Sequence, residues 1–199
     1  MSPPSSPLPV TIRDATEEDM ASIQSIYSFY VTRTAASFEE VVPDVEEMKN
    51  RRRFVLSRGL PYLVAEEHGE VLGYTYAGPF RPRSAYRFTV EDSIYVAPFV
   101  VRRGIGGTLL SALIDRCTAL GYRQMIAVIG DSANQGSIAV HRSRGFGQEG
   151  VLRGVGLKFG RWVDAVIMHR VLDGDDRPLP DGSIAPPLPS SCFHDDGIL

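Results

Sequence analysis

The segment Arg102–Gly107, with the sequence Arg-Arg-Gly-Ile-Gly-Gly, joins a strand-like stretch to a helix-like stretch. Before it, Phe88–Val96 is rich in β-branched and aromatic residues, which favours a strand. After it, Thr108–Leu120 places its apolar residues on one helical face and ends at Gly121. A strand that passes through a glycine-rich turn into a helix is typical of α/β domains, so this connection constrains the fold strongly.

The rest of the chain alternates between helical and strand-like patterns. We expect further helices from Thr16 to Val31, from Pro43 to Arg53 and over Gly136–Arg144. We expect further strands over Tyr62–Glu66, Val71–Ala77, Met125–Ile129, Phe146–Leu152 and Val163–Leu172. Hairpins beside strand–helix–strand crossovers predict a mixed central sheet.

Two terminal segments differ in composition from this central part. Residues 1–9 are rich in Ser and Pro, and residues 173–199 are rich in Pro, Asp, Gly and Ser. Neither has enough apolar residues to offset the entropy of ordering, so we expect solvated tails, with docking on the domain or a partner as the alternative. One domain then spans residues 10–172.

Charge and composition exclude several classes of protein. The net charge of −3 divides into −5 on residues 173–199 and +2 on the remainder, which gives no electrostatic case for nucleic acid. No apolar run reaches the roughly 18–20 residues of a membrane span, and the first residues lack a signal peptide's features. Cys117 and Cys192 form no metal-binding pattern, so we expect no metal site and a cytoplasmic location.

The glycine-rich segment has the chemistry of an anion site. Glycines let the backbone approach a ligand, and the N–H groups that begin the following helix favour phosphate. A nucleotide-binding P-loop would need Gly-x-x-x-x-Gly-Lys, which is absent, and a dinucleotide fingerprint would need a third glycine where Leu109 stands. A structural turn with solvated arginines remains the alternative for this segment taken alone.

Further motifs in a fixed order carry a resemblance to a known family. They are the run Val90–Val96, the glycine segment, Asn134, Ser137, and the run His141–Phe146. They also include Ala85-Tyr86 after a loop of Pro and Arg, and Lys158-Phe159-Gly160-Arg161-Trp162. Together they resemble the GNAT acetyltransferase superfamily, and within it the phosphinothricin and methionine sulfoximine N-acetyltransferases. The resemblance covers Ile12 to Leu172 and departs at Val101, where the family usually has Gln or Arg.

The resemblance implies a fold and a way of holding acetyl-CoA. The fold would be α/β, with a mixed, mostly antiparallel central sheet, splayed strands and helices on both faces. The backbone of Ile94, Tyr95 and Val96 would pair with pantetheine, and an N–H near Val96 would stabilise the developing oxyanion. The pyrophosphate would lie on Arg102, Arg103, Gly104, Ile105, Gly106 and Gly107. Asn134 would bind the cofactor arm, or else only cap a helix.

The resemblance also implies catalytic and substrate-binding residues. Glu91 would be the general base that takes a proton from the amine, or else a solvent-facing carboxylate. His141 would protonate the leaving thiolate or assist Glu91, or else serve a structural role. A carboxylate-bearing substrate would meet Arg81 and Arg83, since guanidinium groups bind carboxylates in bidentate fashion. Asp92 and Ser93 would flank the amine, Tyr86 would form a wall of the pocket, and Phe38 would lie in a loop near the substrate.

The sequence therefore predicts an acetyl-CoA-dependent N-acetyltransferase that acts on the α-amino group of a small amino acid or analogue by direct transfer. The resemblance further implies a homodimer. Two alternatives stay open at this point: an acetyltransferase for peptides or other amines, and a module that binds acyl-CoA without turnover.

Overall fold

A seven-stranded sheet with the order β1-β2-β3-β4-β5-β7-β6 forms the centre of the molecule. The computed structural model describes residues 10–100 and 102–172. The strands are β1 (Thr11–Asp14), β2 (Tyr62–Glu67), β3 (Glu70–Pro79), β4 (Thr89–Val96), β5 (Gln124–Gly130), β6 (Gly147–Lys158) and β7 (Arg161–Val171). The helices are α1 (Met20–Arg33), α2 (Val45–Ser57), α3 (Ile105–Ala119) and α4 (Gln135–Ser143), with short 3₁₀ turns at Ser84–Tyr86 and Pro98–Val100.

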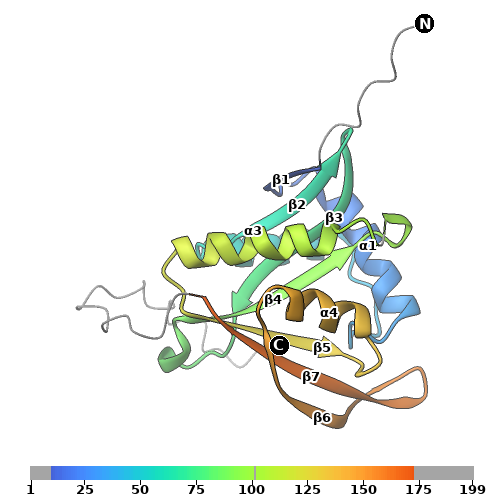
Figure 1. Ribbon diagram of the computed structural model, residues 1–199. Helices are drawn as coiled ribbons and strands as arrows, with labels where there is room; N and C mark the ends of the chain where they lie inside the picture. The colour runs from blue at the N-terminus through green and yellow to red at the C-terminus, as the bar shows by residue number, and fades with distance from the viewer. Residues whose placement is uncertain (1–9, 101, 173–199) are drawn as a thin grey trace, which may run out of the picture.

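Strands β4 and β5 form the one parallel pair of this sheet, and they separate part-way along their length. They pair from Thr89 opposite Gln124 to Asp92 opposite Ala127, whereas β4 continues to Val96 and β5 to Gly130. Beyond Asp92, β4 stays bonded to β3 alone, and beyond Ala127 β5 stays bonded to β7. The two halves of the sheet therefore diverge and leave a gap between strands (Figure 1).

Helices cover both faces of this sheet. In Figure 1, α3 crosses in front of β2, β3 and β4, and α4 lies in front of β5, while α1 lies behind the sheet. The buried face of α3 carries the apolar residues that its sequence predicts, including Leu109, Leu113 and Cys117. The buried face of α1 includes Ile23, Tyr27 and similar residues. The predicted mixed, mostly antiparallel sheet with splayed strands and helices on both faces is confirmed.

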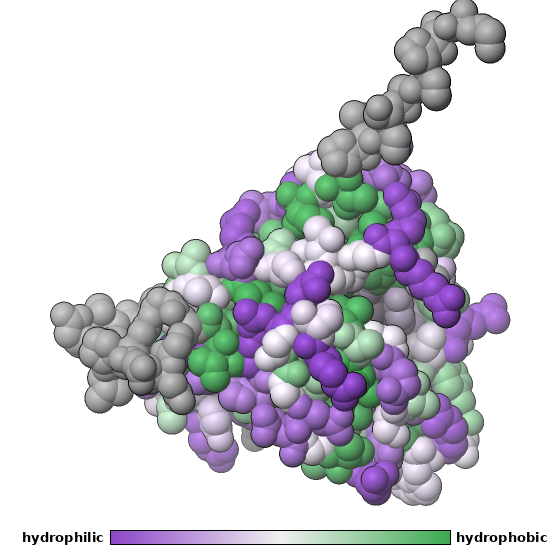
Figure 2. Space-filling model, in the orientation of Figure 1, coloured by the Kyte–Doolittle hydropathy of each residue, from purple (hydrophilic) through white to green (hydrophobic). Residues whose placement is uncertain are grey.

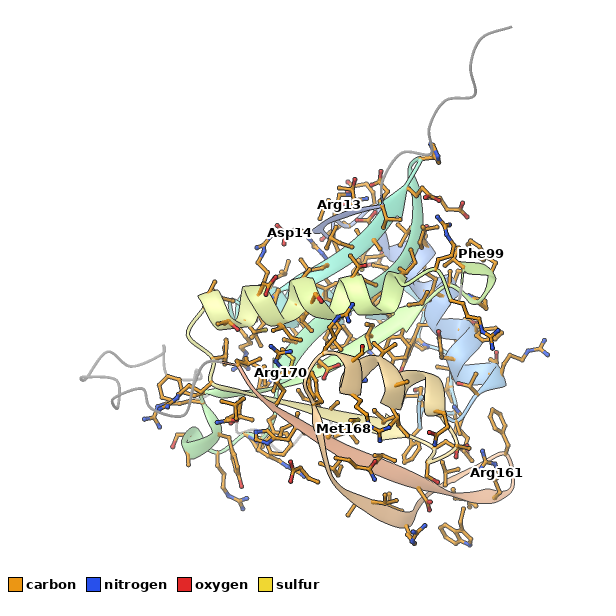
Figure 3. The ribbon with its side chains drawn as sticks, in the orientation of Figure 1. Arg13, Asp14, Phe99, Arg161, Met168 and Arg170 are labelled. Carbon is orange, nitrogen blue, oxygen red and sulfur yellow. The ribbon has the colours of Figure 1, made fainter. Side chains whose placement is uncertain are left out.

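Some element boundaries differ from the sequence prediction. Helix α1 begins at Met20 rather than at Thr16, because the Asp19 carboxylate accepts the Thr16 N–H and pairs with Arg13, which holds residues 16–19 in a turn. Helix α3 begins at Ile105, so Gly106 and Gly107 belong to its first turn. Strand β1 was not predicted, and Figure 3 shows Arg13 and Asp14 on it. Both predicted tails and Val101 lie outside the described residues.

The face of the molecule drawn in Figure 2 carries both polar and apolar side chains. Figure 2 shows polar side chains interspersed with smaller apolar areas, one of them at the lower edge over the β6–β7 hairpin. None of the described helices is long and apolar enough to cross a membrane.

Candidate active site

A cavity of about 1040 Å³ lies where β4 and β5 separate. Its walls come from β4, the start of α3, the end of β5, α4, α1 and the segment 36–39. The predicted site residues that line it are Phe38, Glu91, Asp92, Ser93, Ile94, Tyr95, Val96, Arg102, Gly104, Ile105, Gly106, Gly107, Asn134 and His141. The fold thus brings together residues that lie far apart in the sequence, from Phe38 to His141.

Glycines shape one end of this cavity. Gly104 caps α3 with a φ of +78°, a left-handed conformation that costs glycine least. A Cβ on Gly107 would lie 2.5 Å from the Arg144 guanidinium, whose Nε donates to the Gly107 carbonyl at 3.1 Å. The first-turn N–H groups of α3 lack partners within the helix and lie at its positive end. With Arg102 in the lining, this end fits an anionic phosphate group.

Arg103, unlike Arg102, points to an acidic partner outside the cavity. Its guanidinium donates to Glu67 at 2.7 Å, and it is not among the residues that line the cavity. The pair joins the α3 loop to the end of β2. Of these two arginines, only Arg102 therefore lines the cavity at the end formed by the glycines.

Glu91 lies on the last paired stretch of β4, opposite Gly78 of β3 and Ile126 of β5. Burial raises the pKa of its carboxyl to about 7, the negative charge of Asp92 adds to that rise, and the positive charge of Arg81 opposes it. A carboxyl with a pKa near 7 exchanges protons readily at neutral pH, which suits a general base. The site's geometry and electrostatics thus agree in giving Glu91 acid–base character.

Asp92 and His141 form a buried pair on the wall of the same cavity. The His141 Nε2 lies 3.0 Å from Asp92 Oδ2, and its Nδ1 lies 2.8 Å from the Ser137 carbonyl. The His141 side chain is 2% exposed and the Asp92 side chain is 1% exposed. Burial lowers the pKa of His141, but the hydrogen bond and charge of Asp92 outweigh it, so the net pKa is raised.

Tyr30 of α1 lines the cavity, although the sequence analysis expected only that it lies in a helix. Its hydroxyl donates to the Val96 carbonyl at 2.6 Å and accepts from the Val96 N–H at 3.3 Å. The backbone donor predicted to stabilise an oxyanion therefore has a hydroxyl as its partner here. An aromatic residue at helical spacing carries no signal that separates this role from core packing.

Residues 36–39 of the segment 34–39 line the cavity, and the β6–β7 hairpin holds this segment. The buried Lys158 donates from Nζ to the Ser37 carbonyl. The Phe38 ring lies against Gly156 so closely that a Cβ there would come within 2.6 Å of it. The sequence predicted Phe38 near the substrate, but it gave Lys158 no role beyond its place in a motif.

Comparisons with known proteins agree with this geometry. The family model of the acetyltransferase (GNAT) domain matches residues 12–167. A phosphinothricin N-acetyltransferase of Alcaligenes faecalis is 52% identical over 86% of this chain and 87% of its own length. An L-methionine sulfoximine/L-methionine sulfone acetyltransferase of Salmonella typhimurium is 41% identical over 82% of this chain and 95% of its own. This chain belongs to the GNAT acetyltransferase family.

A solved structure of the same family shows a related fold. It is a GNAT superfamily phosphinothricin acetyltransferase from Sinorhizobium meliloti in complex with acetyl-CoA. It matches with a TM-score of 0.86 and 46% identity over 91% of this chain and 98% of its own. The predictions of a GNAT fold and of an enzyme of the acyltransferase class are confirmed.

Within this GNAT chain, the predicted substrate arginines are not brought to the cavity wall. Arg81, Arg83 and Tyr86 are exposed on the connection between β3 and β4. Arg81 lies over the Phe80 ring at 5.1 Å, and it shares a shallow depression with Tyr86. The charge of Arg81 still acts on Glu91, which places this loop on the Glu91 side of the molecule.

Asn134 caps α4, as one of its two predicted roles requires, and its position leaves the other role, binding the cofactor arm, as a prediction. Its side chain accepts the Ser137 N–H as the cap of α4, and it also lines the cavity. Among the residues that the structure describes, no group of three or more His, Cys, Asp or Glu could hold a metal ion.

Proposed function

We propose that this GNAT enzyme transfers an acetyl group from acetyl-CoA to the α-amino group of a small amino acid or amino-acid analogue. Phosphinothricin and methionine sulfoximine are the analogues that the names of its relatives suggest. The observation that carries the proposal is the Glu91 carboxyl, whose pKa is raised to about 7 on the wall of the cavity between the splayed strands.

The cavity's own residues suit acetyl-CoA along its length. The backbone of Ile94–Val96 has no strand partner on the β5 side, so an extended arm can pair with it once the Tyr30 hydroxyl leaves Val96. The first turn of α3 and Arg102 would hold the pyrophosphate, and Asn134 would bind the arm. When bound, acetyl-CoA supplies an acetyl group activated as a thioester.

Glu91 would remove the proton that keeps an amine from acting as a nucleophile. An ammonium has no free electron pair, so the amine must lose a proton before it attacks. Direct transfer is favoured because the Cys117 thiol is fully buried and is not among the residues that line the cavity. His141 would return its Nε2 proton to the leaving sulfur, and the hydrogen bond from Nε2 to Asp92 would open in that step. Arg81 and Arg83 stay proposed as partners of a substrate carboxylate.

The test is turnover followed by free-thiol release over amino acids, the two analogues and short peptides. Glu91→Gln should lower kcat at least about 100-fold while acetyl-CoA binding is retained. Glu70→Gln, at the exposed start of β3, is the matched control. An unchanged pH–rate profile in Glu91→Gln would exclude Glu91 as the base. Activity on peptides alone would favour the peptide acetyltransferase, and tight binding without turnover would favour the binding module.

We also infer a homodimer that forms through the β6–β7 hairpin. Strand β6 lies at the edge of the sheet, and Val155, Leu157 and Trp162 are 53%, 57% and 70% exposed. Leu157 and Trp162 are register partners, so they share one face. An apolar patch on an edge strand suits a second copy of the chain. Light scattering of the parent and of Leu157→Lys tests this.

A cytoplasmic location stays a prediction, which cell fractionation tests.

A further inference from the structure

Asp92 is a buried carboxylate with one oxygen bonded and one without a partner. Its Oδ2 meets His141, whereas its Oδ1 has no hydrogen-bond partner although it is buried. An unsatisfied buried carboxylate oxygen costs stability, so a purely structural role explains it poorly. Asp92 also lines the cavity next to Glu91, on the last residue pair before the strands separate. We therefore look for the role of the Asp92 carboxylate in the cavity rather than in the packing of the core.

The contacts of His141 fix which of its nitrogens exchanges a proton. Nδ1 lies 2.8 Å from the Ser137 carbonyl, which can only accept, so Nδ1 carries a hydrogen. Nε2 is therefore the nitrogen that gains or loses a proton, and it faces Asp92. The Phe146 ring meets the imidazole edge-on at 5.1 Å between ring centroids, which limits its rotation. The ring is held in one orientation.

The charged, titratable and hydrogen-bonding groups around this pair come from three elements. From β4 come Asp92 itself and Glu91, whose carboxyl feels the charge of Asp92. From α3 comes the Cys117 thiol, which also feels that charge and stays neutral because burial and Asp92 raise its pKa to about 12. From α4 comes the Ser137 carbonyl. Asp92 is therefore the charge that acts on His141 and on Glu91 together.

We propose that Asp92 is a positioning residue that keeps His141 protonated at Nε2 and, through the same charge, sets the proton affinity of Glu91. The proposal rests on the proposed function, in which Glu91 is the base and His141 the acid. One carboxylate would then tune both partners: it favours the acid form of His141 by attraction and the neutral form of Glu91 by repulsion. Asp92 itself need not touch the substrate.

The change Asp92→Asn separates this role from a structural one. Without the negative charge of Asp92, the protonated form of His141 is no longer stabilised by attraction, so the pKa of His141 should fall. The ionised form of Glu91 is no longer destabilised by repulsion, so the pKa of Glu91 should fall as well. The rising limb of the pH–rate profile, set by Glu91, and the falling limb, set by His141, should both move to lower pH. We expect the falling limb to move by roughly one to three pH units, the effect of one close charge.

A purely structural role gives a different result. Loss of packing would lower kcat or the melting temperature while both limbs stay at their parent pH values, and that outcome would overturn the proposal. Asp14→Asn, on exposed β1 far along the sheet from the cavity, is the matched control and should leave the profile unchanged.

A measurement without turnover distinguishes this inference from the proposed function. The imidazole nitrogens of His141, assigned with His141→Gln, are titrated by NMR in the free protein. In the parent, His141 should stay protonated above pH 6.5, its ordinary pKa, and Asp92→Asn should lower that titration. A parent His141 that titrates below pH 6.5 would overturn the proposal even if Asp92→Asn did not fold. Absence of acetyl transfer with the expected titration would instead contradict the proposed function.

Discussion

At the scale of single residues, the buried carboxyl of Glu91, our proposed general base, has a cost in stability. Burial and the charge of Asp92 raise the pKa of its carboxyl from 4.5 to about 7. Between these values the folded chain binds the proton more tightly than the unfolded chain does, so stability falls as pH rises through this window. Above pH 7 the ionised group costs on the order of 3 kcal/mol of folding free energy.

Glu91→Gln should therefore stabilise the fold while it removes activity. The amide carries no charge, so the variant should exceed the parent's free energy of unfolding at pH 8 by up to about 3 kcal/mol. The difference should disappear below pH 4.5, where the parent carboxyl is neutral in both states. Urea unfolding at pH 4 and pH 8 measures it. Glu70→Gln should stay within about 0.5 kcal/mol of the parent. Equal gains at both pH values would contradict the electrostatic cause.

At the scale of elements, the segment 34–39 and the β6–β7 hairpin form one structural unit. Lys158 donates to the Ser37 carbonyl, and Phe38 rests on Gly156. Gly130 of β5 also permits this approach, since a Cβ there would overlap the carbonyl oxygens of Ala35 and Ala36. Burial lowers the pKa of Lys158, and the charges of Glu40 and Glu39 oppose that change. A cavity wall is thus held by a buried ammonium.

Lys158→Met should loosen that wall. It leaves the Ser37 carbonyl without its donor, so we expect the free energy of unfolding to fall by about 1–3 kcal/mol. The KM for the amine should rise because Ser37 and Phe38 line the cavity, whereas the Kd for acetyl-CoA should stay unchanged. Steady-state kinetics and calorimetry measure the two. Lys49→Met, which removes a surface pair with Glu46, is the control. A changed Kd with an unchanged KM would contradict this account.

Most of the helices and strands, but not all of their boundaries, could be predicted from the sequence. The periodic elements were predicted because burial of one face repeats with the period of the element, as in α3. Strand β1 was not predicted because four residues are too few to show a pattern. The predicted strand Phe146–Leu152 ends six residues before β6 does, because Gly150, Gly154 and Gly156 interrupt the alternation of apolar and polar residues. The start of α3 was placed too late because glycines disfavour a helix, although their small size lets α3 approach α4.

Contacts between distant residues lay beyond sequence reasoning. The motifs that carried the family resemblance supplied Glu91 and His141, but not the Asp92–His141 contact, whose partners are 49 positions apart. The Lys158–Ser37 contact joins residues 121 positions apart. Charge and burial emerge only once the sheet brings such residues together. The exposed position of Arg81 and Arg83, away from the cavity wall, likewise follows from the course of one loop.

At the scale of the whole molecule, the sheet consists of two halves that share a short seam. The half β1–β4 and the half β5–β7 pair directly over only Thr89–Asp92 and Gln124–Ala127. Contacts of α3 with α4, such as Arg144 with Gly107, add to that seam. The cavity lies beside it and is lined from both halves. A ligand in the cavity would therefore hold the halves together.

Acetyl-CoA should accordingly stabilise the molecule as a whole. At 100 times its Kd, a ligand that binds only the folded state adds about 2.7 kcal/mol, which raises the Tm of a chain of this size by roughly 5–11 °C. Because the site spans the seam, amide hydrogen exchange should slow both in residues 94–96 and in residues 134–137. Gly104→Ala forces a side chain into a left-handed conformation, so it should weaken binding and shrink the Tm shift at a fixed concentration. Protection confined to one half would show that acetyl-CoA does not bridge the seam, and the cavity would then serve only one of the two.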